Sequence, residues 1–257
     1  MTDLSIPRSW IALLLVVAST GSLVGCGRKS AITVFTADEL VAAVTEASAE
    51  FREQGAPRVT IRAGATADLA RAIDQEEAAD LWLSADPAWT DSLLAGGRLE
   101  VAGTRVLAWD SLVAVVPAGQ GPAPINQYLL PDYRRIATAD TTTSLAGRCT
   151  KQGLTAMGVW GAIRDRVVTA ADARSALAMV ERGEADAGIV PATFAKSASG
   201  VEVGFTLSEG THDVLACTGA VVQGTRHAET ARRFLDFLSG PRGREILRRH
   251  GFLGVGE

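Results

Sequence analysis

The segment Ile32–Leu40, whose sequence is ITVFTADEL, determines the fold that the rest of the chain is expected to adopt. Its first four residues are apolar or β-branched, and this composition predicts a buried strand. A turn and the start of a helix follow, with Thr36, Asp38 and Glu39 in the first helical turn. A helix that begins directly after a strand presents free backbone N–H groups and the positive end of its dipole at the sheet edge. The segment therefore predicts a ligand site that suits an anion.

The same order of strand and helix recurs along the chain. Further strands are predicted at 59–62, 81–84, 111–117, 135–138, 187–190 and 201–205, with a short one at 167–168 and a long one at 214–222 that Gly219 interrupts. Apolar residues at helical spacing predict helices at 38–53, 88–95, 145–157, 172–182, 228–238 and 242–250, and another that begins near Leu69. Buried strands that alternate with helices predict an α/β fold with a parallel sheet and right-handed crossovers.

The first 26 residues have the features of a targeting segment. Arg8 supplies a positive charge, and Trp10–Ala18 is apolar but too short to span a membrane comfortably. The stretch Leu23–Cys26 resembles the lipobox of bacterial lipoproteins, which implies lipidation of Cys26 and cleavage just before it. Residues 1–26 are therefore expected to be a lipoprotein signal peptide, and the lipid to tether the protein to the outer surface of a membrane. An uncleaved anchor or an ordinary signal peptide is the alternative.

Composition and cysteine content limit the classes of function. Hydrophobic residues make up 47% of the chain and charged residues 21%, which is ordinary for a globular protein. The net charge is −4 and no basic stripe with aromatic residues is visible, so nothing favours binding to nucleic acid. Beyond Cys26, only Cys149 and Cys217 remain, too few and too far apart for a zinc site. They either form a disulfide or remain as two buried thiols. The sequence predicts neither a metal ion nor a cofactor.

Many segments resemble the periplasmic molybdate-binding proteins of ABC importers, and the resemblance covers nearly all of the chain after the leader. It is carried by Ile32–Phe35, Leu69–Ile73, Ala79–Asp86, Ser111–Pro117, Ala146–Gly147, Met157–Trp160, Asp172–Glu181, Gly183–Val190, Glu209–His212, Phe234–Leu238 and Gly251–Phe252. The resemblance implies a two-lobed type II periplasmic-binding-protein fold, in which each lobe is a mostly parallel sheet flanked by helices. Two strands, near 111–117 and 216–222, are expected to cross between the lobes. Lobe one is expected to contain residues 31–112 plus 217–257, and lobe two residues 113–216.

The resemblance also implies a site in the cleft between the lobes. The family holds a tetrahedral oxyanion with serine hydroxyls, backbone N–H groups and one tyrosine hydroxyl, because neutral donors and helix N-termini match the anion. In this chain the second serine position is Thr66, which keeps the hydroxyl, and the first is Glu39. The tyrosine position is Pro191, which has neither a hydroxyl nor an N–H. With two backbone contacts added, the expected ligand-binding residues are Thr36, Glu39, Thr66, Ala146, Ala173 and Pro191.

Glu39 is the main departure from the family pattern. An ionised carboxylate at ~4 Å from a dianion in a partly desolvated cleft is repulsive by several kcal/mol, more than one hydrogen bond returns. Three roles are open for it: contact with the ligand, simple solvation, and a capping box in which Thr36 is the N-cap and Glu39 reaches back to the cap N–H. Thr66 is either a ligand contact or an N-cap. The neighbouring threonines Thr141, Thr142 and Thr143 are interpreted as loop stabilisers.

The sequence thus predicts a monomeric, lipid-anchored solute-binding protein, located in the periplasm or on the outer face of the cell membrane. It would capture a small ligand and deliver it to an ABC permease. The ligand is an oxyanion such as molybdate or tungstate, or an altered ligand whose hydrogen-bond donor or positive charge suits Glu39. The alternative is an extracytoplasmic sensor or scaffold of the same fold that has lost oxyanion binding. An enzyme is not expected, because no nucleophile has a visible base partner.

Overall fold

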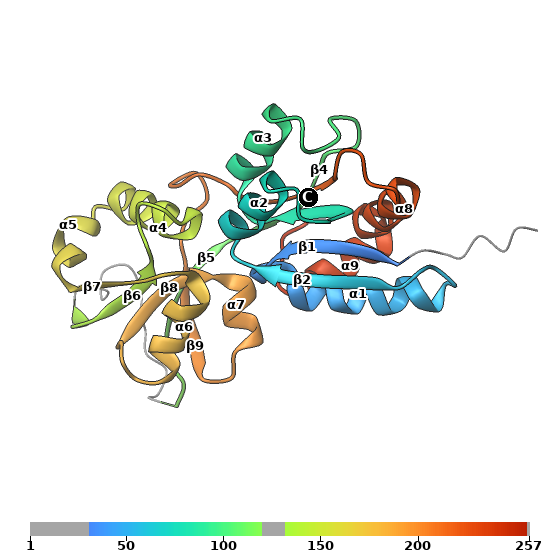
Figure 1. The fold of residues 1–257 in the computed structure, drawn as a ribbon. Coiled ribbons are helices and arrows are strands. Elements are labelled where there is room, and N and C mark those ends of the chain that lie inside the picture. The colour runs from blue at the N-terminus through green and yellow to red at the C-terminus, as the bar shows by residue number, and fades with distance from the viewer. Residues whose placement is uncertain (1–30, 120–131, 256–257) are drawn as a thin grey trace, which may run out of the picture.

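The computed structural model describes residues 31–119 and 132–255. In these residues ten strands form two five-stranded sheets, and helices pack on both sheets (Figure 1). The predicted signal peptide and Cys26 lie outside the described residues. Within the described ranges, no helix combines the length and the apolar character that a membrane crossing needs.

The first sheet has the strand order β2-β1-β3-β10-β4. Strand β1 pairs parallel with β2 and β3, whereas β10 runs antiparallel between β3 and β4. Its strands are β1 (Ile32–Ala37), β2 (Val59–Gly64), β3 (Leu81–Ser84), β4 (Arg105–Asp110) and β10 (Leu215–Val221). Its helices are the 3₁₀ turn η1 (Asp38–Leu40), α1 (Val41–Glu53), α2 (Thr66–Asp74), α3 (Pro87–Ala95), α8 (Ala228–Ser239) and α9 (Pro241–Arg249).

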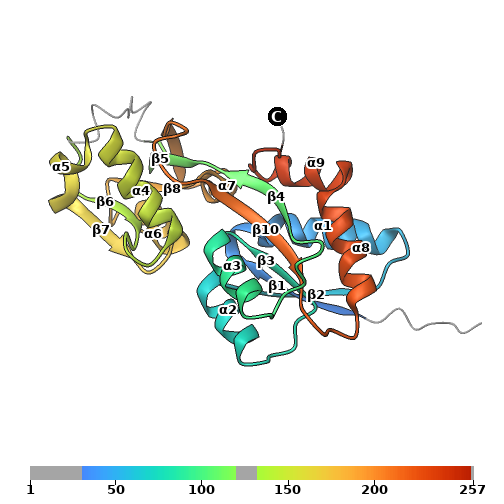
Figure 2. The same cartoon turned by 90° about the horizontal axis from the view of Figure 1, so that it is seen from above.

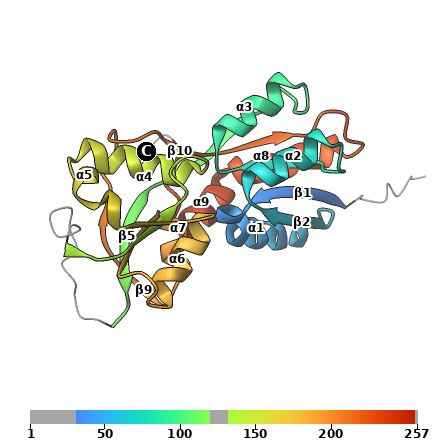
Figure 3. The ribbon, with the colours of Figure 1, turned by 60° about the vertical axis from the view of Figure 1, so that its left-hand side comes forward.

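Two separate apolar clusters fix these helices on the two faces of the first sheet. Helices α1, α8 and α9 pack on one face, where the rings of Phe51 and Phe234 lie 5.1 Å apart between centroids. Helices α2 and α3 cover the other face around the fully buried Trp82. Figure 3 shows α1 and α2 on opposite sides of β1 and β2. We call this sheet with its helices the first lobe.

The second sheet has the strand order β7-β6-β8-β5-β9. Strand β6 pairs parallel with β7 and β8, and β5 runs antiparallel to both β8 and β9. Its strands are β5 (Leu112–Pro117), β6 (Ile136–Ala139), β7 (Val167–Ala170), β8 (Ala187–Pro191) and β9 (Val201–Thr206). The second lobe adds the helices α4 (Leu145–Ala156), α5 (Trp160–Ile163), η3 (Arg164–Arg166), α6 (Ala173–Glu181) and α7 (Ala192–Ser197).

The chain passes between the sheets twice. Strand β4 ends at Asp110 and β5 begins at Leu112, so Ser111 alone separates the two sheets on the outward path. The return path runs through residues 207–214 into β10, and Figure 2 shows β10 beside β4 and β5 where they connect the lobes. Leu112, placed in lobe one from the sequence, pairs with Pro191 in the second sheet. Leu215, placed in lobe two, pairs with Asp110 in the first sheet.

The predicted two-lobed α/β fold is confirmed, with three differences in detail. Both sheets are mixed rather than parallel, because the strands that connect the lobes run against their neighbours. Strand β4 and helix α7 were not predicted. The prediction that Gly219 interrupts its strand was wrong, since β10 is continuous and fully buried from Leu215 to Val221.

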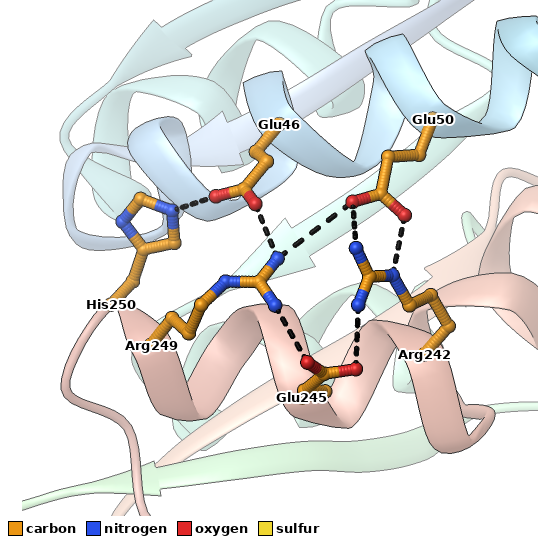
Figure 4. A network of polar contacts seen from close by, with 6 residues as sticks. All are labelled: Glu46, Glu50, Arg242, Glu245, Arg249 and His250. Carbon is orange, nitrogen blue, oxygen red and sulfur yellow. Dashed lines mark hydrogen bonds and ion pairs between the residues drawn. The ribbon is translucent and has the colours of Figure 1, made fainter.

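A network of ion pairs joins the last helix to α1 (Figure 4). Arg242 contacts Glu50 of α1 and Glu245 of its own helix, each at 2.6 Å. Arg249 in turn contacts Glu245 at 2.9 Å and also pairs with Glu46 of α1. Single exposed pairs contribute little, but charges shared among several partners hold one geometry better. The network therefore fixes the C-terminal helix against the helix that begins at the end of β1.

Gly219 is required where β10 passes under α8. A Cβ atom at this position would lie 2.6 Å from Leu235 Cδ1 and 3.1 Å from side-chain atoms of Leu107 and Leu83. Because a packed core resists added volume, Gly219→Ala is expected to lower the free energy of unfolding by about 1–3 kcal/mol in urea titrations. Gly161→Ala is the matched control, since its Cβ would meet nothing within 4 Å. Equal unfolding midpoints for the two variants would contradict the packing described for β10.

Candidate ligand-binding cleft

A cavity of about 390 Å³ lies between the two lobes. The first lobe contributes η1, the start of α2, the β3–α3 connection and the end of β4 to its walls. The second lobe contributes the starts of α4 and α6 and the β8–α7 junction. Five of the six residues predicted to bind ligand line this one cavity: Glu39, Thr66, Ala146, Ala173 and Pro191.

Helix N-termini from both lobes border the cavity without side-chain caps. Helix α2 follows Ala65 and helix α4 follows Ser144, and neither of these N-cap residues makes a side-chain capping hydrogen bond. Both residues line the cavity, so the first N–H groups of the two helices face its interior. Helix α6 differs, because the carboxylate of Asp172 accepts a hydrogen bond from Ser175 N–H at 2.7 Å. Two helix ends thus offer donors to an anion from opposite lobes.

The threonines beside these helix ends have separate roles. Thr66 is the first residue of α2 rather than its N-cap, so the capping alternative for Thr66 was wrong. Its side chain lies at the cavity wall. Before α4, Asp140 Oδ1 accepts hydrogen bonds from the backbone N–H and hydroxyl groups of both Thr142 and Thr143. These bonds hold the pKa of Asp140 well below its usual value and agree with the loop-stabilising role expected of the two threonines.

The predicted capping box at the end of β1 is not formed. Strand β1 extends to Ala37, which is the N-cap of η1 and makes no side-chain capping bond. Thr36 is therefore a strand residue, fully buried, whose hydroxyl contacts Ala37 O at 3.4 Å. Thr36 is absent from the cavity wall, and the prediction that it binds ligand has no geometric support. Glu39 is freed from capping and lines the cavity.

Glu39 and Asp110 are two acidic residues at the cavity, of which Asp110 is buried and Glu39 is partly buried. Burial raises the pKa of Glu39 to about 7; its own backbone N–H and Arg174 act to lower this pKa, whereas the neighbouring charges of Asp110 and Asp38 act to raise it. Asp110 accepts hydrogen bonds from Thr193 Oγ1 at 2.6 Å and from Ser111 N–H at 2.8 Å. Burial nevertheless raises the pKa of Asp110 to about 6. Both carboxyls therefore change charge close to neutral pH.

Two arginines of the second lobe reach the first lobe across the cleft. Arg174, the second residue of α6, donates to Asp38 O at 3.3 Å, and its guanidinium lies 4.7 Å from the centroid of the Phe194 ring. Arg148 of α4 contacts the buried Asp86 at 3.3 Å. These contacts bridge the two lobes and place positive charge on the side of the cavity formed by the second lobe.

Several residues at this cavity were not predicted from the sequence. Arg174 directly follows Ala173, and this position beside a predicted ligand contact could have predicted that Arg174 lies at the cavity. Asp110 gave no such signal, because it ends a strand that the hydrophobic pattern did not reveal. Arg148 acts through Asp86, which lies on the other lobe and far away in the sequence. The two arginines thus reach the cleft residues of the first lobe only through contacts between lobes.

The two remaining cysteines are free and buried, so of the two alternatives left open by the sequence the structure has the buried thiols and not the disulfide. Cys149 packs in the core of the second lobe and contacts Asp213 O at 3.4 Å. Cys217 packs in the core of the first lobe and reaches the cavity wall. The two thiols belong to different cores, and burial raises the pKa of both. In residues 31–119 and 132–255, no group of three or more histidine, cysteine or acidic side chains is arranged to hold a metal ion.

The raised pKa of Glu39 makes a prediction about stability. Its pKa in the folded protein, about 7, exceeds the ordinary value of 4.5. The contribution of protonated Glu39 to the free energy of unfolding is therefore fully present below about pH 4.5 and is lost as the pH rises through 7. Because glutamine cannot ionise, the free energy of unfolding of Glu39→Gln at pH 8 is expected to exceed that of the wild type by up to about 3 kcal/mol. The gain should vanish near pH 4.5, as urea titrations at both pH values would show. Glu53→Gln, an exposed change at the end of α1, is the control. An equal gain in the free energy of unfolding at both pH values would refute the raised pKa of Glu39.

Comparison with known proteins identifies the fold and the family. Residues 32–253 match the family model described as bacterial extracellular solute-binding protein. The chain is 32% identical to the molybdate-binding protein ModA of Escherichia coli K12 over 95% of this chain and 98% of that one. It is 27% identical to the putative ABC transporter substrate-binding lipoprotein YvgL of Bacillus subtilis, over 94% of each chain.

Solved structures agree on the fold. The periplasmic molybdate-binding protein of Azotobacter vinelandii matches with a TM-score of 0.76 and 20% identity, over 86% of this chain and 98% of that one. The sulfate-binding protein SubI of Mycobacterium tuberculosis matches with a TM-score of 0.71 and 17% identity, over 88% of each chain. The resemblance seen in the sequence is thereby confirmed. The chain belongs to the bacterial extracellular solute-binding protein family that includes the periplasmic molybdate-binding proteins.

Proposed function

We propose that this protein is the solute-binding component of an ABC importer and that it captures a small oxyanion in the cavity between its lobes. The observation that carries the proposal is that two uncapped helix N-termini, of α2 and α4, border one cavity from opposite lobes. Free N–H groups and helix dipoles bind anions without a full counter-charge. Several relatives are named as molybdate-binding proteins, which supports an oxyanion as the ligand.

The remaining donors come from side chains that differ from the family pattern. Thr66 supplies a hydroxyl at the start of α2. Pro191 offers no donor, and Arg174 supplies a charged one from the same lobe. Backbone groups at Ala146 and Ala173 complete the proposed set. Because the relatives are transport proteins, they give no support to the alternative of a sensor or scaffold, and none to an enzyme.

Binding is proposed to close the lobes on the ligand. The proposed moving units are residues 31–110 plus 215–257 and residues 112–206, with bending at Ser111 and in residues 207–214. Two connections of this kind permit a hinge motion. The contacts of Arg148 and Arg174 with the first lobe would then stabilise the closed form.

Calorimetric titration of residues 27–257 with molybdate, tungstate and sulfate at pH 6.5 tests the proposal. At least one of these anions should bind at a ratio of one per monomer, and saturation should reduce the radius of gyration in small-angle scattering. Thr66→Val should weaken binding about 5- to 10-fold, which corresponds to one hydrogen bond. Thr60→Val, on exposed β2, is the matched control. Absence of binding to all three anions, and to phosphate and arsenate as well, would refute an oxyanion-binding function.

Lipid attachment at Cys26 is proposed from the lipobox, and the relative named as a lipoprotein supports it. A lipid chain would hold the protein on the outer face of a membrane, near the permease. In cells that express the full chain, Cys26→Ser should abolish incorporation of a labelled fatty acid and move the protein from the membrane to the soluble fraction. Cys149→Ser, at a buried thiol, should retain the label. A label that persists in Cys26→Ser would refute the anchor.

A further inference from the structure

An anion in this cavity would meet two kinds of group with opposite electrostatic effects on it. The helix ends of α2 and α4 and the side chain of Arg174 are donors, whereas Glu39, an acid, lines the same cavity. A fully deprotonated oxyanion satisfies the donors but is repelled by an ionised Glu39. A cation satisfies Glu39 but leaves the helix ends unmatched. The ligand that matches both kinds of group is an anion with one hydrogen on the oxygen that faces Glu39.

Two carboxyls of this cavity, Glu39 and Asp38, have no hydrogen bond to another side chain among the described residues, and the charge of Arg174 lies beside Asp38, to whose carbonyl oxygen Arg174 donates. Asp68 pairs with Arg71. Asp110 is occupied by Thr193 and Ser111, Asp86 by Arg148 and by Ala88 N–H, and Asp172 by Ser175 N–H. Among the described residues, Glu39 has a hydrogen bond with its own backbone N–H and with no other side chain. Its carboxyl thus keeps an oxygen for the ligand.

The charged groups that face Glu39 come from every element around it. Asp38 precedes it in η1 and Asp110 ends β4, whereas the thiol of Cys217 in β10 is kept neutral because burial raises its pKa. Arg174, from α6, is the cation in this set. Burial is the largest cause that favours the neutral form of Glu39, and the two neighbouring acids add to it, so that the pKa of Glu39 is raised to about 7 against the opposing effects of its own N–H and Arg174.

Building on the proposed function, we propose that the cleft binds its oxyanion together with one proton, shared between a ligand oxygen and the Glu39 carboxyl. For sulfate or molybdate the proton comes from solvent: ionised Glu39, one proton and the dianion combine into a complex in which the acid donates to the anion. Hydrogen phosphate or hydrogen arsenate brings the proton as its own O–H, which the ionised carboxylate accepts. No bond other than this O–H is made or broken.

Dianions without a proton and anions that carry an O–H are therefore expected to differ in how their affinity changes above neutral pH. The free cleft loses its proton as the pH rises, and a dianion must recover one from solution. An anion that retains an O–H needs no proton from solution. The preferred substrate class at alkaline pH is the hydrogen oxyanion, and Glu39 is the residue that determines this specificity.

The test is calorimetric titration of residues 27–257 between pH 6 and pH 9 with molybdate, sulfate, phosphate and arsenate. The association constant for molybdate or sulfate should fall about tenfold per pH unit above pH 7, because one proton is taken up. Phosphate and arsenate should show at most a small change between pH 7.5 and pH 9. Titrations with molybdate at pH 8, in two buffers of different ionisation enthalpy, should give an uptake of one proton per anion.

Variants separate Glu39 from the other acids. The amide of Glu39→Gln donates at every pH, so molybdate binding should become independent of pH and proton uptake should vanish. Glu53→Gln should retain the wild-type pH profile, since it lies outside the cavity. A pH dependence that persists in Glu39→Gln and disappears in Asp110→Asn would overturn the assignment to Glu39.

The outcomes also distinguish this inference from the proposed function. Oxyanion binding without proton uptake, or with the same pH profile for all four anions, overturns the shared proton and leaves the oxyanion-binding function intact. Failure of every anion to bind across the whole pH range overturns both. The uptake measurement uses the wild-type chain, so it decides the matter even where a variant is altered in folding.

Discussion

The hydrogen bond between the Asp110 carboxylate and the Thr193 hydroxyl is the contact on which the cleft depends. It measures 2.6 Å, is buried, and joins the last residue of β4 to helix α7 at the point where the chain changes sheets. Ala192 N–H donates to Ser111 O at 2.8 Å beside it. A buried carboxylate is costly without such donors, so the junction between the lobes is held in one arrangement. The same carboxylate lies close enough to Glu39 to disfavour its ionisation.

The chemistry of the cavity follows from this arrangement. A serine at position 39 would add one neutral donor to a site already rich in helix N–H groups. Glu39 instead adds a group that donates or accepts according to its proton, in surroundings that bring its pKa near neutrality. Arg174 offsets part of the added acidity from the second lobe. The departure from the family pattern is therefore local and leaves the donors of α2 and α4 in place.

Sequence patterns predicted those features that depend on neighbours along the chain. The alternation of buried strands and amphipathic helices was sufficient for an α/β fold. The family resemblance placed Ala146 and Ala173 at a cavity, and both lie in the first turns of helices that border it. Predictions that required knowledge of packing were wrong. Gly219 was interpreted as a strand break, although it gives room for Leu235 inside a continuous strand. Thr36 and Glu39 fit a capping box by spacing, but pairing with β2 extends β1 to Ala37 and moves the helix start beyond Thr36.

The sequence by itself thus determined the two-lobed fold, the helix ends that border the cleft and the carboxyl at position 39. These features follow from hydrophobic periodicity, turn residues and a family pattern that extends over the whole folded chain. Only the tertiary structure decided how that carboxyl behaves. Its pKa is raised first by burial and then by Asp110, which ends a distant strand of the same lobe, while Arg174 lies near it only because the two lobes meet. The separation of Cys149 and Cys217 into different cores has the same origin, since distances across a cleft are fixed by packing.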